Sequence, residues 1–431
     1  MKTVFMSFST DVIHGGHIAI IQKAAELGDL TVGVVNDSIV ASYKRFPLLS
    51  TVERMKIFRG IAGVKHVSEQ ASISGIDLIR ELKPDYVVHG DDWLHDFRLS
   101  GRQEVLEFLS SYGGQLVEYP YSSNPVYAEY EGQASSRLSL PDIRRGRLRN
   151  LLSLKPLVSA IEAHSGLSGL IAENTKVEKD GISYQFDAIW LSSLCDSTAK
   201  GKPDIELVDF TSRLRTLDDI LEVTTKPVIF DADTGGQIEH FTFIMRTLER
   251  IGVSAAIVED KVGLKRNSLF GDKAGQTQDT IEHFCDKIRT GKSALKTKDI
   301  MIIARIESLI LKQGMQDALS RAFAYVNAGA DGIMIHSKEK TPDEIFEFCD
   351  KFRSEQPKVP LVVVPSTYSS VCQDELKSHG VNIVIYANQL TRSAFKAMQK
   401  TAETILSNQR ALEADADCLP IKDIIRLIPE S

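Results

Sequence analysis

The chain has 431 residues, of which 25% are charged and 43% hydrophobic, and this size and composition predict a globular protein of two domains. Its formal net charge of -7 argues against a nucleic-acid-binding protein, which usually carries a basic surface. Five scattered cysteines without CxxC spacing, and the lack of a signal peptide or membrane-length apolar run, indicate a cytoplasmic protein with no membrane partner.

The first part of the chain alternates between strand and helix patterns. Residues 2–8 are expected to form a first strand, and the helical pattern 18–27 ends at Gly28. Strands are also predicted over 30–35 and 86–88, and the alternation continues to about Val117. This order predicts a Rossmann-like, doubly wound parallel sheet.

Two histidines, His14 and His17, follow the first strand and are separated by two glycines. Glycines allow the backbone to approach a ligand closely, and the start of a helix offers unpaired N–H groups to phosphate. At this spacing the two imidazoles can converge on one phosphate. Alternatively, the histidines only cap the turn, and the HxxH pattern alone leaves both interpretations open.

The surrounding segments resemble the cytidylyltransferase branch of the HxGH nucleotidyltransferases. The matching stretches are TDVIHGGH, KAAELGDLTVGVVND, SYKR, STVERMKIF and VVHGDDW, within residues 1–95. The resemblance implies that CTP is a substrate and that His14 and His17 stabilise charge on its α-phosphate. It implies nucleotide binding by Ser9, Thr10, His14, His17, Lys44, Arg54, Asp91, Asp92, Trp93, Ser135, Ser136 and Arg137.

One motif departs from that family. The family closes its site with an arginine followed by Thr-Glu-Gly-Ile-Ser-Thr, whereas this chain has Glu129 at the arginine position and one inserted residue. Either Arg137 makes the triphosphate contact instead, or the domain is weakened or inactive. The basic run 138–150 is expected to be a linker between domains 1–137 and 151–431, with a solvated helix as the alternative for its charges.

The second part of the chain predicts a (β/α)8 barrel, because eight apolar strand candidates fall within roughly 240 residues. The candidates are 157–161, 187–191, 227–230, 254–258, 301–304, 332–335, 361–364 and 383–385. A polar group follows each of them: Glu162/His164, Ser192/Ser193, Asp231/Asp233, Glu259/Asp260, Arg305/Glu307, His336/Ser337/Lys338, Ser366/Thr367 and Asn388. Polar residues after every strand are typical of an active-site mouth.

Two of these strand ends are acidic and lie next to a basic loop. Asp231 and Asp233 follow one strand, Glu259 follows the next, and the loop 261–268 contains three basic residues. Carboxylates beside cations suit a divalent cation that holds a small anionic substrate. A simpler alternative is that Asp260 and Lys261 only pair with each other.

Long, correctly ordered motifs over nearly all of 151–431 resemble phosphoenolpyruvate mutase of the isocitrate lyase superfamily. They are AHSGLSGLIAE, DAIWLSSL, VIFDADTGG, VEDKVGLKRNS, IIARIES, GADGIMIHSK and VVVPSTY. The resemblance implies conversion of phosphoenolpyruvate to phosphonopyruvate.

The resemblance also implies roles for individual residues. It implies Mg²⁺ binding by Asp231, Asp233 and Glu259, and substrate binding by Trp190, Ser192, Ser193, Leu194, Arg305 and His336. It further implies a water-excluding catalytic gate formed by Asp204, Lys261, Asn267 and Ser268, with Glu307 supporting the metal or Arg305. His336 could instead be a rim residue that does not touch substrate, and Cys195 is interpreted as a packing residue.

The gate loop distinguishes among related activities. Carbon–carbon lyases of the superfamily carry a cysteine in this loop, which is absent here, and phosphonopyruvate hydrolases carry threonine where this chain has Asn267. The asparagine favours the mutase. A mutase with an inactive N-terminal domain, and a hydrolase or lyase, remain as alternatives.

The fusion of the two parts resembles bifunctional enzymes of phosphonate pathways, including that of fosfomycin. In those enzymes the nucleotidyltransferase acts on a C2 phosphonate such as 2-hydroxyethylphosphonate. The resemblance also implies a homo-oligomer, dimer or tetramer, formed through the barrel.

Overall fold

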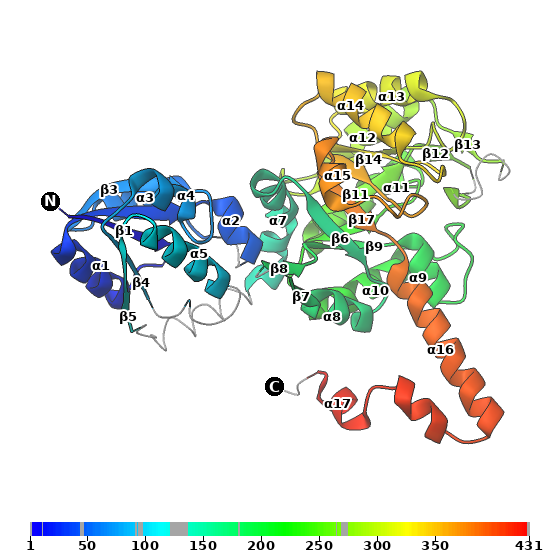
Figure 1. The fold of residues 1–431 in the computed structure, drawn as a ribbon. Coiled ribbons are helices and arrows are strands. Elements are labelled where there is room, and N and C mark those ends of the chain that lie inside the picture. Colours follow the sequence, from blue (N-terminus) through cyan, green and yellow to red (C-terminus); the bar gives the residue numbers. More distant parts are fainter. Residues whose placement is uncertain are drawn as a thin grey trace. The chain divides into compact units, whose positions relative to one another are not determined.

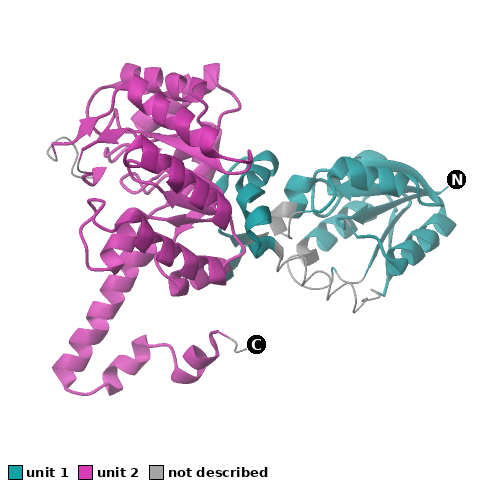
Figure 2. Ribbon diagram, turned by 180° about the vertical axis from the view of Figure 1, so that it is seen from behind, with its two compact units in different colours: residues 1–158, 174–186 teal, residues 159–173, 187–431 magenta. Residues whose placement is uncertain are grey.

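The computed structural model describes residues 2–10, 12–43, 47–90, 93, 98–120, 137–179, 182–263, 265–268 and 275–428. The chain divides into two compact units (Figure 2). Residues 1–158 and 174–186 form unit 1, and residues 159–173 and 187–431 form unit 2. Within the described part of the chain, no helix has the length and apolar character needed to span a membrane.

Unit 1 contains a five-stranded parallel sheet with the order β3-β2-β1-β4-β5. Its strands are β1 (Thr3–Phe8), β2 (Asp29–Val35), β3 (Val64–Gln70), β4 (Tyr86–Gly90) and β5 (Gln115–Tyr119). The sheet is connected by α1 (Gly15–Leu27), α2 (Asp37–Tyr43), α3 (Thr51–Arg59), α4 (Ile76–Leu82) and α5 (Arg98–Ser110). The strand order reverses between β1 and β4, and this switch point is where ligands bind in open α/β sheets.

Two apolar cores cover the two faces of this sheet. Successive strand residues point to opposite faces, so Met6 packs with residues of α1 and α3 while Phe5 packs with residues of α4 and α5. Helices therefore lie on both faces, which confirms the predicted doubly wound fold (Figure 1).

The run predicted as a linker is helical. Helix α7 (Pro141–Leu154) begins with a proline in its first turn, a position where the missing N–H costs nothing. Arg144 and Leu148 are buried, so one face of this helix is packed and only part of the run is solvated. Unit 1 also includes the hairpin of β7 (Lys176–Lys179) and β8 (Ile182–Gln185). The domain boundaries at 138 and 150 stay a prediction.

Unit 2 is built on a closed barrel with the strand order β10-β11-β14-β15-β16-β17-β6-β9. The strands are β6 (Val158–Glu162), β9 (Ala188–Leu191), β10 (Val228–Asp231), β11 (Ala255–Glu259), β14 (Met301–Ile306), β15 (Gly332–Ile335), β16 (Leu361–Val363) and β17 (Ile383–Tyr386). The eight predicted strands are confirmed, each within two residues. These segments are β-branched and almost entirely buried, as strands covered on both faces must be.

Helices surround the barrel and extend beyond it. They are α8 (Gly166–Asn174), α9 (Ser193–Ala199), α10 (Phe210–Val223), α11 (Ile238–Ile251), α12 (Ile281–Ala294), α13 (Met315–Asn327), α14 (Asp343–Glu355), α15 (Gln373–Ser378), α16 (Gln389–Asn408) and α17 (Ile421–Arg426). Short strands β12 (Lys261–Val262) and β13 (Thr277–Gln278) pair antiparallel at the base of the loop after β11. This pairing fixes both ends of the loop near the strand ends that carry the predicted site.

Candidate active site

A cavity lies where the barrel strands end. Ten residues predicted from the sequence line it: Trp190, Ser192, Ser193, Leu194, Asp204, Asp231, Asn267, Ser268, Arg305 and His336. Lys265, Met334, Val364, Ser366, Ala387 and Asn388 complete the lining. The carboxyl ends of parallel strands meet at one rim, which is why side chains so far apart in the sequence converge here.

Asp231 and Asp233 lie among hydrogen-bond donors and cations on one side of this site. Asp231 accepts hydrogen bonds from the backbone N–H (3.0 Å) and hydroxyl (2.8 Å) of Ser193. Asp233 accepts one from Arg213 Nη1 at 2.9 Å and another from the Lys265 ammonium. Burial opposes ionisation of Asp231, but the charges of Lys265, Arg213 and Arg305 outweigh it and lower its pKa to about 2.

Glu259 is in a different situation. Its side chain is 1% exposed, yet neither carboxylate oxygen accepts a hydrogen bond from any residue that the structure describes, and burial raises its pKa. The nearest cations are Lys261 Nζ and Arg305 Nη1, each 3.4 Å from Oε2. A buried carboxylate without donors is costly unless a cation binds it.

The predicted metal ligands surround the ammonium of Lys265. Burial opposes the charge of this lysine, but Asp233, Asp231, Glu259 and Asp204 together raise its pKa well above the usual value. The described residues contain no group of three or more His, Cys, Asp or Glu side chains that could hold a metal ion in their present positions. The donor chemistry nevertheless fits Mg²⁺, since it consists of carboxylate oxygens and includes those of Glu259, which accept no hydrogen bond within the described part of the chain.

A second cluster joins Arg305, His336 and Glu307. Arg305 donates to Glu307 through Nε (2.6 Å) and to His336 Nδ1 through Nη2 (2.9 Å). Burial, and then the charge of Arg305, lower the pKa of His336, so its imidazole is neutral at pH 7. Because Nδ1 accepts a hydrogen bond, the ring proton lies on Nε2, where it can be donated to a ligand.

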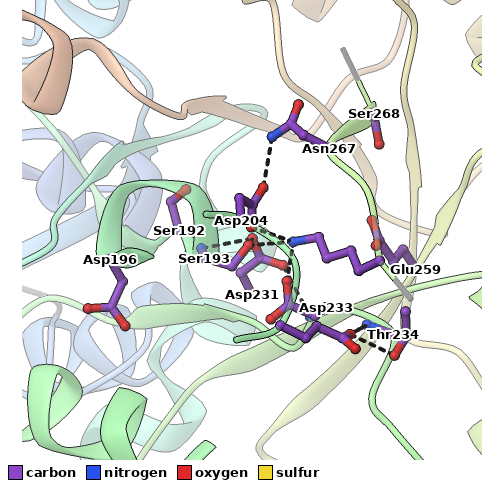
Figure 3. A network of polar contacts seen from close by, with 12 residues as sticks. Ser192, Ser193, Asp196, Asp204, Asp231, Asp233, Thr234, Glu259, Asn267 and Ser268 are labelled. Atoms are coloured by element: carbon purple, nitrogen blue, oxygen red, sulfur yellow. Dashed lines mark hydrogen bonds and ion pairs between the residues drawn. The ribbon is translucent and has the colours of Figure 1, made fainter. Parts of the chain in front are cut away.

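Lys265, Asn267 and Ser268 line the cavity, and the first two contact Asp204; Figure 3 shows the bond between Asn267 and Asp204. Lys265 Nζ lies 3.0 Å from Asp204 Oδ1, and Asn267 Nδ2 donates to Oδ2 at 2.8 Å. Ser268 donates to Glu307 at 2.6 Å and accepts from Lys261 Nζ at 3.0 Å. The predicted gate residues therefore come together, with Lys261 buried behind the cavity lining.

Two charged residues of this site were not assigned a role from the sequence. Lys265 belongs to the basic loop. Its position two residues before the predicted gate residue Asn267 could have identified it as a site residue. Arg213 lies in the first turn of α10, where neither a strand end nor a motif marks it. The alternative in which Asp260 and Lys261 only pair with each other is wrong, because Asp260 contacts Arg321, Tyr325 and Gln278 instead.

In unit 1, His14 and His17 lie side by side at the start of α1. His14 Nδ1 accepts from Gly16 N at 3.1 Å, and His17 Nδ1 accepts from His14 N at 3.4 Å. Their rings stack with centroids 3.8 Å apart. The histidines therefore do cap the helix, and these caps also hold the two imidazoles together at the switch point of the sheet.

Other predicted nucleotide-binding residues have internal partners. Arg54 is 1% exposed and pairs with Asp37 at 2.6 Å. Trp93 stacks on His89 with ring centroids 3.8 Å apart and donates to Glu118 at 2.6 Å. The hydroxyl of Thr10 forms hydrogen bonds with the backbone of Val12. Ser9 is the first residue after β1. The predictions for seven further residues concern parts of the chain that the structure does not describe: Lys44, Asp91, Asp92, Glu129, Ser135, Ser136 and the side chain of Arg137.

The fold and the site define a two-part α/β protein. The cavity at the end of its barrel is lined by charged side chains. Its Rossmann-like unit carries a histidine pair at the switch point of the sheet. Residues 148–406 match the family described as phosphoenolpyruvate phosphomutase, and residues 9–130 match the cytidylyltransferase-like family. The chain belongs to the phosphoenolpyruvate phosphomutase family and carries a cytidylyltransferase-like domain before the barrel.

Known relatives of the barrel differ in the activities that their names give. The phosphoenolpyruvate phosphomutase of Tetrahymena pyriformis is 34% identical over 282 residues, covering 65% of this chain and 90% of that protein. The phosphonopyruvate hydrolase of Variovorax sp. (strain Pal2) is 35% identical over 282 residues, covering 65% and 93%. A crystal structure of phosphonopyruvate hydrolase in complex with oxalate and Mg²⁺ is 32% identical with a TM-score of 0.59, covering 66% and 94%.

Proposed function

We propose that the barrel isomerises phosphoenolpyruvate to phosphonopyruvate and that the N-terminal domain transfers CMP from CTP to a small phosphonate such as 2-hydroxyethylphosphonate. The observation that carries the first part is the contact of Asn267 and Lys265 with Asp204 across a cavity lined by Arg305 and His336. This arrangement supports a reaction that binds a phosphoryl group and excludes water.

In the proposed isomerisation, the bond between phosphorus and the enol oxygen breaks and a bond between phosphorus and C3 forms. The electron pair of the broken bond stays on the pyruvate enolate, whose C3 then attacks the phosphorus. No proton is gained or lost overall, so no acid or base is required. Arg305 would hold the migrating group by its charge, and neutral His336 would donate a hydrogen bond from Nε2.

Asp231, Asp233 and Glu259 are the residues that would hold Mg²⁺. When bound, this ion would neutralise the substrate carboxylate and the developing enolate oxygen. The Glu259 oxygens, which accept no hydrogen bond from the described residues, and the depressed pKa of Asp231 support this assignment, because a bound cation would favour the ionised form of both carboxylates. The N–H and hydroxyl of Ser193 would keep Asp231 oriented.

Water exclusion separates the mutase from its alternative, a hydrolase. Water that reaches the migrating phosphoryl group gives phosphate and pyruvate instead of a phosphonate. The 2.8 Å bond between Asn267 and Asp204 supports a closed cavity and therefore the mutase. A relative named phosphonopyruvate hydrolase is 35% identical to this chain, so the hydrolase alternative needs its own test.

For the N-terminal domain, a phosphonate oxygen would attack the α-phosphorus of CTP and pyrophosphate would leave. The paired rings of His14 and His17 at the switch point support this role, because together they can stabilise charge on that phosphate. The alternative is a domain that has lost this activity, since Glu129 replaces an expected arginine. The five free cysteines support a cytoplasmic location for the protein.

Phosphorus-31 NMR tests the barrel reaction. The enzyme with Mg²⁺ is incubated separately with phosphonopyruvate and with phosphoenolpyruvate. We expect each compound to appear from the other, with little phosphate. Stoichiometric phosphate from phosphonopyruvate, without phosphoenolpyruvate, would instead identify a hydrolase.

Pyrophosphate release from CTP tests the N-terminal domain. We expect release to require a hydroxyethyl- or aminoethylphosphonate acceptor and to be lost in His17→Ala, while the barrel reaction of that variant is unchanged. His66→Ala, on an exposed position of β3, is the matched control. No pyrophosphate with either acceptor would favour the inactive-domain alternative.

A further inference from the structure

Arg213 reaches Asp233 and the backbone of Asp231, two of the proposed Mg²⁺ ligands, from a helix outside the ring of strands. It lies on α10, and its side chain is 4% exposed. Nη1 donates to Asp233 Oδ2 at 2.9 Å and also to the backbone carbonyl of Asp231. Nη1 therefore connects the side chain of Asp233 with the backbone at Asp231, the last residue of β10, while Nη2 donates to the carbonyl of Leu191 at 3.5 Å.

Two further contacts keep this guanidinium in place. It lies over the ring of Phe230, with the guanidinium carbon 4.4 Å from the ring centroid. Its Nε is 3.8 Å from Oδ2 of Asp196, a fully buried carboxylate. Asp196 is itself held by Lys200 and by the hydroxyl of Thr216, which donates at 2.8 Å. A chain of buried partners thus fixes Arg213 before any ligand binds.

The turn that Arg213 contacts is strained. Asp233 has φ = 53°, in the left-handed region that non-glycine residues adopt at a cost. Such a conformation persists only where its surroundings determine it. Here the Asp233 carbonyl accepts from Glu259 N at 2.8 Å, and its carboxylate is held by Arg213. The same turn therefore connects Asp233 to the strand that carries Glu259.

Lys265 and Arg213 hold opposite oxygens of Asp233 but belong to different elements. Lys265 binds Oδ1 and comes from the segment that lines the cavity, whereas Arg213 binds Oδ2 from a helix packed against the barrel. A movement of that segment away from the barrel would separate Lys265 from Asp233, whereas the contact between Arg213 and Asp233 would remain.

We propose that Arg213 is a positioning residue that holds Asp231 and Asp233 in the orientation needed to bind a divalent cation, whatever the position of the Lys265–Ser268 segment. This inference rests on the proposed Mg²⁺ site of the same barrel. Two effects of Arg213 on a cation oppose each other. Its charge repels the cation, whereas its hydrogen bonds orient the ligands. Loss of an outer hydrogen-bond partner of a metal ligand typically weakens metal binding by about 10- to 100-fold, so we expect orientation to dominate.

The test is Mn²⁺ binding by the full chain without substrate, followed by electron paramagnetic resonance of the free ion. We expect Arg213→Met to bind Mn²⁺ at least about tenfold more weakly than the wild type. Arg213→Lys keeps the charge but not the fork of donors and should recover binding only in part. Arg215→Met, on an exposed position of the same helix, should bind like the wild type.

A second variant covers the case in which Arg213→Met does not fold, as judged by circular dichroism. Asp196→Asn leaves Arg213 present but weakens its anchor, and it should weaken Mn²⁺ binding by a smaller factor. In turnover assays of both variants, the Mg²⁺ concentration for half-maximal rate should rise more than kcat falls, which a merely structural defect would not produce.

The outcomes separate this inference from the proposed function. Wild type that binds no Mn²⁺ would overturn both the metal site and the role of Arg213. Wild type that binds, together with folded Arg213 and Asp196 variants that bind equally well or more tightly, would overturn the role of Arg213 alone.

Discussion

Asp204 accepts contacts from two residues of the Lys265–Ser268 segment at the barrel site. Lys265 donates a hydrogen bond to one oxygen of the Asp204 carboxylate, and Asn267 donates to the other. Lys265 also contacts Asp233, so one segment connects the proposed cation-binding residues with the proposed cover of the cavity. The amide of Asn267 adds a neutral donor beside the ion pair of Lys265 and Asp204. That chemistry suits a cover whose task is to exclude water.

Truncating this amide should therefore change the product as well as the rate. We expect Asn267→Ala to lower the rate of phosphonopyruvate conversion about 100-fold, or roughly 2.7 kcal/mol in the barrier, because the cover no longer closes on Asp204. The fraction of phosphate among the products should rise, as measured by phosphorus-31 NMR. Asn174→Ala, at the exposed last residue of α8, serves as the control. An unchanged rate and product ratio would remove Asn267 from the gate.

The cysteines give a prediction that depends on burial. Burial raises the pKa of the thiols of Cys195 and Cys349 to about 12, and it also raises the pKa of Cys285. Cys372 and Cys418 are exposed. Because the thiolate is the reactive form, a thiol reagent at pH 8 should label two cysteines rapidly and the other three only after denaturation. Mass spectrometry of the labelled peptides would identify them, and rapid labelling of Cys195 would contradict its interpretation as a packing residue.

At the scale of elements, the sequence predicts best what a local pattern encodes. Each barrel strand is a short β-branched run, and the polar groups after the strands converge because parallel strands end at one rim. The hairpin of β7 and β8 escaped prediction because β7, Lys-Val-Glu-Lys, is short and exposed along its length. The role of Arg213 was not predicted, because it depends on which strand α10 packs against. The periodicity of the sequence does not reveal this packing.

The start of α16 is another element that depends on tertiary contacts. Glu162, at the end of β6, is fully buried and accepts a hydrogen bond from Thr391 N in the first turn of α16 at 2.5 Å. Its second oxygen lies 3.0 Å from His164 Nδ1. The carboxylate thus caps the helix that leads away from the barrel, with Ala387 and Asn388 in the cavity wall just before it.

Removing this cap should loosen α16. We expect Glu162→Ala to lower the free energy of unfolding by about 3 kcal/mol, because it leaves buried donors without a partner. Glu162→Gln keeps an acceptor and should cost about 1 kcal/mol. Urea unfolding followed by circular dichroism measures both changes. Equal losses for the two variants would indicate that packing volume, and not the helix cap, is the main contribution.

At the scale of the whole molecule, the C-terminal helices lack an apolar core of their own. No residue of α16 or α17 is buried, and Figure 1 shows α16 leading away from the barrel. Phe395 and Met398 are 63% and 65% exposed and lie on one face of α16, and Ile421 and Ile425 of α17 are 77% and 70% exposed. An exposed apolar surface of this kind usually marks a protein–protein contact.

We therefore propose that these helices pack against a second copy of the chain, in agreement with the predicted homo-oligomer. Light scattering after size-exclusion chromatography should give at least twice the monomer mass of 47.8 kDa for the wild type. Phe395→Asp combined with Met398→Asp should shift the mass toward the monomer, because an interface does not tolerate buried unpaired charges. Lys396→Ala, on a polar exposed position between them, should not. A wild type that is monomeric at micromolar concentration would contradict the proposal. Retained Mn²⁺ binding by a monomeric double variant would show that each barrel holds its own complete cation site.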